Sequence, residues 1–190
     1  PLGEDGDGFE LRRCLAHLGI DQTFLVSHSA YLTPTYTKPM LHRREGEPEE
    51  LDRLDIRVRK VLHPDLENNI CRFLEELVPK LDGLIVVDQF EIPNQKAVTQ
   101  TVRNSIKSIA LEYPDKVIFV DSRSQAGDYS EVILKPNHAE AVRALGEVLQ
   151  NESLDSAALT GLNLSKRTNR IVFLTVGEAG ILVCDGKRGS

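Results

Sequence analysis

Two short segments of the sequence carry residues that could bind a phosphate group. Asn137 and Glu140 stand three residues apart in KPNHAE (135–140), after a short apolar run, and Thr175 begins TVGEAG (175–180). A carboxylate can hold magnesium through the ion's water shell, and glycines let backbone amides approach a phosphate closely. Both segments are therefore candidates for a nucleotide site.

Each segment also has an ordinary structural interpretation. Asn137 and Glu140 have the spacing of a capping box, in which the two side chains satisfy the first amides of a helix. The glycines of 175–180 suit a hairpin loop between two apolar strands. The capping and binding roles are compatible, so both remain open.

Further polar residues follow apolar runs. Asp88 ends the run 84–87, and Asp121 ends the run 116–120, with Arg123 two residues later. Ligands of parallel sheets bind at the carboxyl ends of the strands, so these side chains are placed to meet a ligand, and Arg123 could face a phosphate. The alternative is that they cap loops.

The apolar spacing predicts an α/β fold. Helical and strand patterns alternate, and the strands are apolar throughout, which is typical of a mainly parallel sheet covered by helices on both faces in three layers. We expect helices over 65–77, 96–112, 138–145 and 154–167, and strands over 84–87, 116–120, 132–134, 171–175 and 181–184.

The first third of the chain has a different pattern. A helix over 9–18 is closed by Gly19, and Thr- and Tyr-rich segments then predict three short antiparallel strands, 23–26, 33–41 and 51–56, with an exposed loop over 42–50. We therefore expect a small β lid over 22–58 beside an α/β core formed by 1–21 and 59–190.

The apolar residues of the predicted lid suggest a homodimer. Four of them would form an exposed face that a second copy could cover: Tyr31, Leu32, Tyr36 and Met40.

Composition excludes several classes of protein. The net charge of -6 disfavours nucleic acid and anionic lipid as partners, and no stretch approaches the apolar length of a membrane span. Cys14, Cys71 and Cys184 are odd in number and far apart, which fits a reducing cytoplasm. Because the chain lacks an initiating Met and stops soon after an apolar strand, we expect both ends to be cuts.

Taken in order along the chain, the segments resemble the ribokinase-like (PfkB) carbohydrate kinases. ILKPNHAEA followed by VFLTVGEAGILVCDG is similar to that family's Asn-x-x-Glu and Thr-x-Gly-x-x-Gly elements. GEDGDGFELRRCLAHLGID resembles its Gly-Asp-Asp-x-x-Gly segment, with Glu4 and Asp5 in the acidic positions. TPTYTKPMLH, LDRLDI and LVPKLDGLIVVDQ are closest in character to the heptose-phosphate kinase branch.

The resemblance implies ATP-dependent phosphorylation of a hydroxyl on a sugar or sugar phosphate, with ATP and Mg²⁺ as cofactors. It implies a three-layer ribokinase-like core and a lid that closes over the sugar. The implied substrate contacts are Lys38, Arg53 and Asp88, although Lys38 and Arg53 could simply protect the edge of a strand. The implied nucleotide contacts are Asn137, Glu140 (also the metal residue), Thr175, Gly177, Gly180 and Asp121.

The sequence departs from the family at both ends. A Gly-rich sugar-binding segment would precede Pro1, and a Gly-Ala-Gly-Asp element, whose Asp is the general base, would follow Cys184. No catalytic residue is therefore assigned, and we expect no useful turnover by this fragment alone. The alternatives are a non-catalytic nucleotide-binding or interaction module and a plain α/β scaffold. The kinase interpretation requires Asn137 and Thr175 to converge on one anion pocket.

Overall fold

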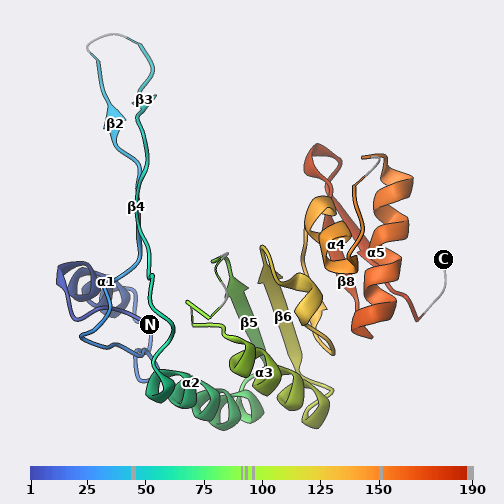
Figure 1. The fold of residues 1–190 in the computed structure, drawn as a ribbon, viewed down its shortest axis with the longest axis horizontal. Helices are drawn as coiled ribbons and strands as arrows, with labels where there is room; N and C mark the ends of the chain where they lie inside the picture. Colours follow the sequence, from blue (N-terminus) through green and yellow to red (C-terminus); the bar gives the residue numbers. More distant parts are fainter. Residues whose placement is uncertain (44–45, 91, 93, 96, 150–151, 188–190) are drawn as a thin grey trace. The chain divides into compact units, whose positions relative to one another are not determined.

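The computed structural model describes residues 1–43, 46–90, 92, 94–95, 97–149 and 152–187. The chain divides into two compact units, the first mainly Pro1–Ile70 and the second mainly Cys71–Asn94 with Val98–Ser190. In Figure 1 they run from blue to cyan and from green to red. Residues 1–21 thus belong to the first unit together with the hairpin. The predicted division into a core of 1–21 and 59–190 and a lid of 22–58 stays a prediction.

The first unit opens with helix α1, Gly6–His17, which starts three residues before the predicted helix. Asp5 is its N-cap: Oδ1 accepts from the Gly8 amide at 2.8 Å, and Oδ2 accepts from the Thr33 amide at 2.7 Å. These hydrogen bonds, those from Thr33 first, hold the pKa of Asp5 below its ordinary value. The acidic segment therefore supports the helix start.

A long hairpin follows α1 (Figure 1). Strand β1, Thr35–Thr37, pairs antiparallel with β4, Leu54–Ile56, and β2, Met40–Leu41, pairs with β3, Glu49–Glu50. The single strand predicted over 33–41 is thus interrupted at Pro39, which has no N–H to donate. Of the predicted loop over 42–50, the described residues 42–43 and 46–48 lie outside the strands, whereas Glu49 and Glu50 form β3; Arg44 and Glu45 lie outside the described residues.

Two details of the predicted lid are wrong. Residues 23–26 form no strand; the chain turns there, and Ser27 makes only an isolated bridge to Leu2. Tyr31 is buried against Leu62 and Leu66, so it is not part of an exposed dimer face. Its hydroxyl donates to the Val61 carbonyl at 2.9 Å, which anchors the base of the hairpin.

Helix α2, Pro64–Leu77, leads through the short 3₁₀ turn η1, Val78–Lys80, into the sheet of the second unit. The sheet order follows the sequence, and its first four strands are parallel while the last is antiparallel. The strands are β5 (Gly83–Asp88), β6 (Val117–Ser122), β7 (Ile133–Leu134), β8 (Val172–Thr175) and β9 (Ile181–Cys184).

The connections of the second unit are helical. They are α3 (Gln100–Glu112), η2 (Ala126–Asp128), α4 (His138–Leu145), α5 (Leu154–Thr168) and η3 (Gly177–Ala179). These elements confirm the predicted α/β class and the predicted order of helices and strands in this unit. Their bounds agree with the predicted ones to within a few residues. Helix α3 begins later than predicted because Thr99 caps it by accepting from the Val102 amide, and Lys96 lies outside the described residues.

One face of the sheet forms the core. Paired side chains share a face, and on this face Leu84 and Leu182 are half-buried. The other side chains of the face are buried: Val86, Asp88, Ile118, Val120, Ser122, Leu134, Val172, Leu174 and Cys184. Helix α3 reaches the face through Arg103, whose guanidinium lies 3.9 Å from Asp88. Helix α5 reaches it through Gly161, where a β-carbon would collide with the sulfur of Cys184.

The opposite face is apolar but open in the described part of the chain. Ile85, Val87, Ile181 and Val183 lie on it with exposed fractions between 56% and 74%. The predicted third layer is therefore not among the described residues. No described helix combines the length and apolar composition that a membrane crossing requires.

Candidate functional site

The start of α4 is held by a complete capping box. The Asn137 side-chain oxygen accepts from the Glu140 amide at 2.8 Å, and Glu140 Oε2 accepts from the Asn137 amide at 2.9 Å. The capping interpretation is confirmed. It also fixes both side chains, because each is tied to the other's backbone.

The second predicted segment lies directly beside this helix start. Asn137 and Thr175 form an isolated parallel bridge, and the Thr175 amide donates to the Pro136 carbonyl at 2.9 Å. Segments 38 residues apart in the chain, at 137 and 175, are thus joined by main-chain pairing shortly after β7 and at the end of β8. The expected proximity of the two segments is confirmed, and a shared anion pocket stays a prediction.

The loop after Thr175 depends on its glycines. Gly177 and Gly180 have φ values of 60° and 95°, in the left-handed region that side chains disfavour. The Val176 amide donates to the Gly180 carbonyl at 2.9 Å, which closes the loop into the tight turn that joins β8 to β9. Neither glycine would find a neighbour within 4 Å of a β-carbon, so backbone conformation alone requires them.

Two depressions adjoin at this edge of the sheet, and they share Asn137 and Ala139. The first, which we call the phosphate-side depression, has a volume of about 610 Å³ and a polar lining. The residues that line it are Arg123, Ser124, Asn137, Ala139, Glu140 and Arg143. The second, of about 470 Å³, we call the base-side depression; it includes the apolar residues Leu149, Leu154, Val176 and Ala179, together with Thr175 and Gly177.

The donor set suits a weakly held magnesium ion and not a caged metal. No group of three or more His, Cys, Asp or Glu side chains among the described residues could hold a metal. Glu140 keeps its Oε1 without a hydrogen-bond partner in the described part of the chain. One free carboxylate oxygen beside a phosphate pocket fits Mg²⁺, which keeps several waters and uses phosphate oxygens as further ligands.

Asp121 lies apart from the two depressions. Its carboxylate forms an ion pair with Lys135 at 3.0 Å, and it stands on the open face of the sheet. It lines neither depression. A direct contact between Asp121 and a nucleotide stays a prediction.

Asp88 is buried, with 1% of its surface exposed. Its Oδ2 accepts from the Ser122 hydroxyl and from the Tyr129 hydroxyl, each at 3.0 Å. Burial and then the negative charge of Asp88 raise the pKa of Tyr129, so that hydroxyl stays a donor. The structure therefore ties Asp88 to its own neighbours, and the predicted sugar contact stays untested.

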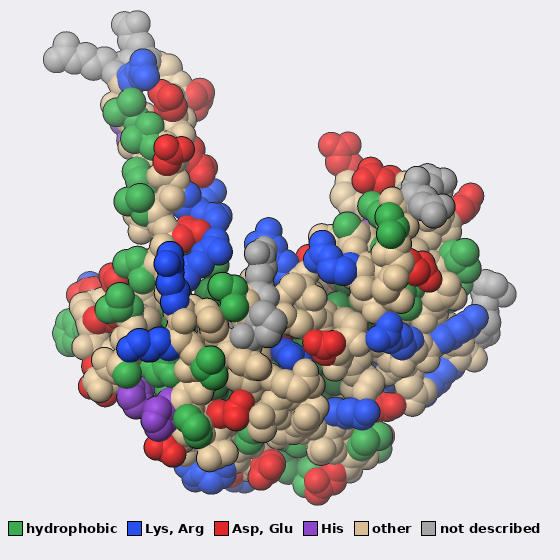
Figure 2. Space-filling model, viewed as in Figure 1, with side chains coloured by type: hydrophobic (Ala, Val, Ile, Leu, Met, Phe, Trp, Pro, Cys, Tyr) green, Lys and Arg blue, Asp and Glu red, His purple; other side chains and the backbone are tan. Residues whose placement is uncertain are grey.

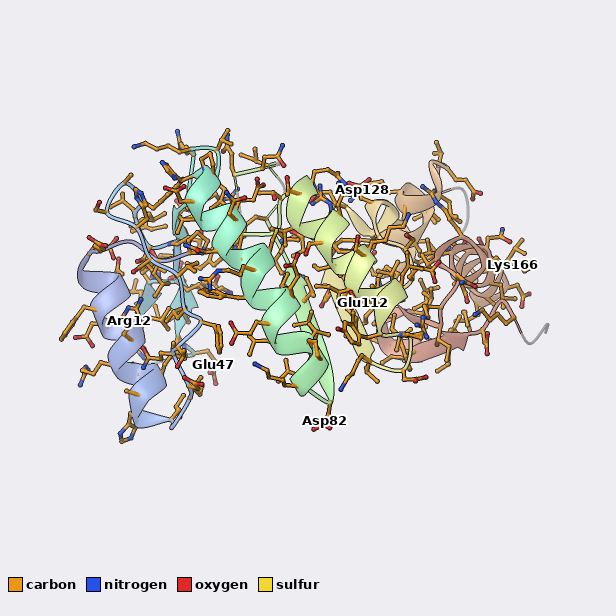
Figure 3. The ribbon with its side chains drawn as sticks, turned by 90° about the horizontal axis from the view of Figure 1, so that it is seen from below. Arg12, Glu47, Asp82, Glu112, Asp128 and Lys166 are labelled. Atoms are coloured by element: carbon orange, nitrogen blue, oxygen red, sulfur yellow. The ribbon has the colours of Figure 1, made fainter. Side chains whose placement is uncertain are left out.

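Arg103 completes this buried network from α3. Besides its approach to Asp88, Nη2 lies 3.7 Å from Asp128, and Nη1 donates to the Val98 carbonyl at 3.2 Å. Figure 3 shows Asp128 near the first turns of α3, with Glu112 at the other end of the helix. The network thus joins β5, β6, η2 and α3.

In the first unit, the predicted substrate residues are held by ion pairs. Lys38 lies 3.1 Å from Glu50, and Arg53 lies 2.8 Å from Asp55 and stacks over the Tyr36 ring at 5.1 Å. Burial alone would raise the pKa of Asp55, but hydrogen bonds from Arg57 and Arg53 outweigh it and hold that pKa below its ordinary value.

The sequence analysis missed a basic depression at the base of the hairpin. It has a volume of about 450 Å³, and Arg57, Arg59 and Lys60 line it together with Tyr31 and Asp55. Figure 2 shows Lys and Arg side chains gathered along the lower part of the hairpin. The sequence could have indicated this basic depression, because three cationic residues occur within four positions directly after a predicted strand.

Arg143 was missed as well. It stands three residues after Glu140 on α4, a spacing that places two side chains on the same face of a helix. That spacing was the available signal. The apolar lining of the base-side depression, by contrast, comes from separate elements and has no local pattern.

Comparison with known proteins supports the fold assignment. No family model matches the chain. The bifunctional protein HldE of a Nitratiruptor species is 25% identical over 186 residues, which are 96% of this chain and 36% of that protein. The bifunctional protein HldE of Helicobacter pylori is also 25% identical over 186 residues, 95% of this chain and 37% of that protein.

Comparison with solved structures supports the same fold. Phosphofructokinase-2 from Escherichia coli, in complex with fructose-6-phosphate, matches with a TM-score of 0.63 and 19% identity over 98% of this chain and 58% of that one. Ribokinase from Giardia lamblia matches with a TM-score of 0.60 and 17% identity over 97% and 55%. The chain has the fold of the ribokinase-like sugar kinases. It spans just over half of these structures and little more than a third of the HldE proteins.

The buried network makes a prediction about stability. Replacing Tyr129 by Phe removes a hydroxyl that donates to buried Asp88, so we expect the free energy of unfolding to fall by about 1–3 kcal/mol in urea titrations. The control is Tyr113→Phe, at a less buried tyrosine, where the change should stay within about 0.5 kcal/mol. Equal effects of the two substitutions would show that Tyr129 does not support Asp88.

Proposed function

We propose that this chain binds ATP with Mg²⁺ at the two adjoining depressions and serves an ATP-dependent carbohydrate kinase. The reaction would transfer the terminal phosphoryl group of ATP to a hydroxyl of a sugar or sugar phosphate, leaving ADP and releasing the hydroxyl proton. The bridge between Asn137 and Thr175 is the observation that carries the proposal, because it places a polar pocket and a more apolar pocket against a common wall.

The two depressions suit the two ends of a nucleotide. A phosphate chain needs donors and cations, which the phosphate-side depression supplies, and a flat base needs apolar contacts, which the base-side depression supplies through Leu149, Leu154 and Val176. The fold similarity to sugar kinases supports the same assignment. The bound ion would neutralise charge on the transferring phosphoryl group.

Each residue then has a defined task. Asn137 and Glu140 fix the helix start beside the phosphates, and Glu140 Oε1 holds the water shell of Mg²⁺. Thr175 ties the loop to the helix start, and Gly177 and Gly180 give that loop its tight path. These residues bind and orient the nucleotide; the proton of the sugar hydroxyl is not assigned to any of them.

On the sugar side, we propose the lid residues of the first unit as contacts. Lys38 and Arg53 are two of these proposed contacts, as the resemblance to the kinase family implied. Arg57, Arg59 and Lys60 line the basic depression together with Asp55, the ion-pair partner of Arg53, and Arg59 has no ion-pair partner among the described residues. This concentration of cations favours a substrate that carries a phosphate group over a neutral sugar.

The nucleotide assignment predicts a magnesium-dependent effect of Glu140. In calorimetric titrations of the chain with ATP and Mg²⁺, we expect Glu140→Gln to weaken binding about tenfold, because it removes the carboxylate that orders the ion's waters. Gln retains the capping hydrogen bond, so the helix start should persist. With EDTA in place of Mg²⁺, variant and unchanged chain should bind alike.

The matched control is Glu147→Gln, which removes the same charge from an exposed residue just beyond α4. It should leave the affinity unchanged. A Glu140→Gln chain that binds ATP and Mg²⁺ as tightly as this control would remove the metal role. Binding of ATP without phosphoryl transfer by a longer protein that contains this chain would favour the non-catalytic module.

The lid assignment predicts selectivity for a phosphorylated sugar. We expect fructose 6-phosphate to bind the chain more tightly than fructose, and Arg59→Gln to weaken only the phosphorylated ligand, by about tenfold, since a charge-assisted hydrogen bond is lost. Calorimetry measures both ligands. Arg13→Gln, at an exposed arginine on α1 paired with Glu10, is the control. Equal affinity for sugar and sugar phosphate would refute the assignment.

We also propose that two copies pair through the hairpin. Leu32, Tyr36 and Met40 of the predicted dimer face are 62%, 54% and 45% exposed. Leu54, 63% exposed on β4, is a further apolar residue of the hairpin that a second copy could cover. Sedimentation equilibrium should show a dimer that Leu54→Glu converts to monomer, whereas Leu159→Glu, at a leucine 62% exposed on α5, should stay dimeric. A monomer for the unchanged chain at high concentration would end this proposal.

A further inference from the structure

The phosphate-side depression carries a local charge opposite to that of the whole chain. Its lining holds two guanidinium groups, of Arg123 and Arg143, and one carboxylate, of Glu140, which gives a net charge of +1. The chain as a whole has a net charge of -6. A basic pocket in an acidic protein attracts anions locally against the general field.

Arg143 is positioned for an anion by a backbone contact. Its Nη1 donates to the Arg123 carbonyl at 3.3 Å, which ties the guanidinium to the segment after β6. No carboxylate among the described residues lies within ion-pair distance of it, although Glu140 is one turn away on the same helix. The guanidinium therefore keeps most of its five N–H donors for a ligand.

Glu140 is prevented from neutralising Arg143. The capping box directs Glu140 Oε2 to the Asn137 amide at 2.9 Å, toward the start of the helix. The wall also contains Ser124, whose hydroxyl oxygen is buried and has no hydrogen-bond partner in the described part of the chain. An unpaired cation and an unpaired hydroxyl in one pocket are the arrangement that a bound anion would satisfy.

We propose that Arg143 is a further phosphate-binding residue of this site, which contacts the polyphosphate end of the nucleotide and favours ATP over AMP. The inference rests on the proposed nucleotide function and deepens it. A guanidinium can bind two oxygens of a phosphate at once, so its contribution grows with the length of the phosphate chain. Arg123 also lines this pocket and adds to the positive potential.

The test compares ligands that differ only in phosphate number. In calorimetric titrations with AMP, ADP and ATP, Arg143→Gln should weaken ATP binding about tenfold and leave AMP almost unchanged. Arg143→Lys should restore part of the loss, because it keeps the charge without the planar pair of donors. Thermal unfolding should be nearly unaffected, since Arg143 is exposed.

Lys107→Gln is the control, because it removes one positive charge from an exposed position on α3 outside both depressions. It should leave all three affinities unchanged. If Arg143→Gln and Lys107→Gln bind ATP equally well, Arg143 does not contact the phosphates, and the proposed function stands without it.

Inorganic tripolyphosphate separates the inference from the proposed function. If the chain binds tripolyphosphate but not ATP, and Arg143→Gln abolishes that binding, the anion site is supported and the nucleotide assignment is refuted. If the chain binds neither ligand, both are refuted.

Discussion

The pairing of Pro136 and Asn137 with Thr175 is the constraint on which the candidate site depends. β7 and β8 share only one register pair, Leu134 with Val172, yet the main-chain contact continues beyond the strand ends to the start of α4. Because backbone hydrogen bonds fix both segments, side-chain flexibility does not change the distance between them. The capping box then orients the two polar side chains at the shared wall.

A second constraint supports the same sheet from its buried face. Asp88 and Arg103 are charged groups in the core, which is costly unless hydrogen bonds compensate them. Ser122 and Tyr129 supply such bonds to Asp88, and Asp128 of η2 lies near Arg103 of α3. Asp88, which the sequence suggested as a ligand contact, thus also belongs to a buried network that joins β5, β6, η2 and α3.

The first unit shows how local patterns can be correct in kind and wrong in detail. Thr- and Tyr-rich segments did indicate antiparallel pairing, and β1 with β4 confirms it. The segment 23–26 forms no strand, because its main-chain pairing with other described segments is limited to the hydrogen bond from the Leu2 amide to the Val26 carbonyl at 3.0 Å. Tyr31 resembled an exposed lid residue, whereas packing against Leu62 and Leu66 buries it. Strand propensity does not identify the partner, and apolar character does not identify the face.

The sequence by itself determined the α/β class, the order of elements and the capping box at Asn137 and Glu140, because periodicity and helix-start chemistry act over a few residues. It also located the glycine loop, whose left-handed backbone only glycine adopts easily. Tertiary structure decided that Asp88 is buried, that Asp121 pairs with Lys135, and that Arg143 joins Arg123 in one pocket. These outcomes depend on contacts between distant segments, and only the packed sheet brings those segments together.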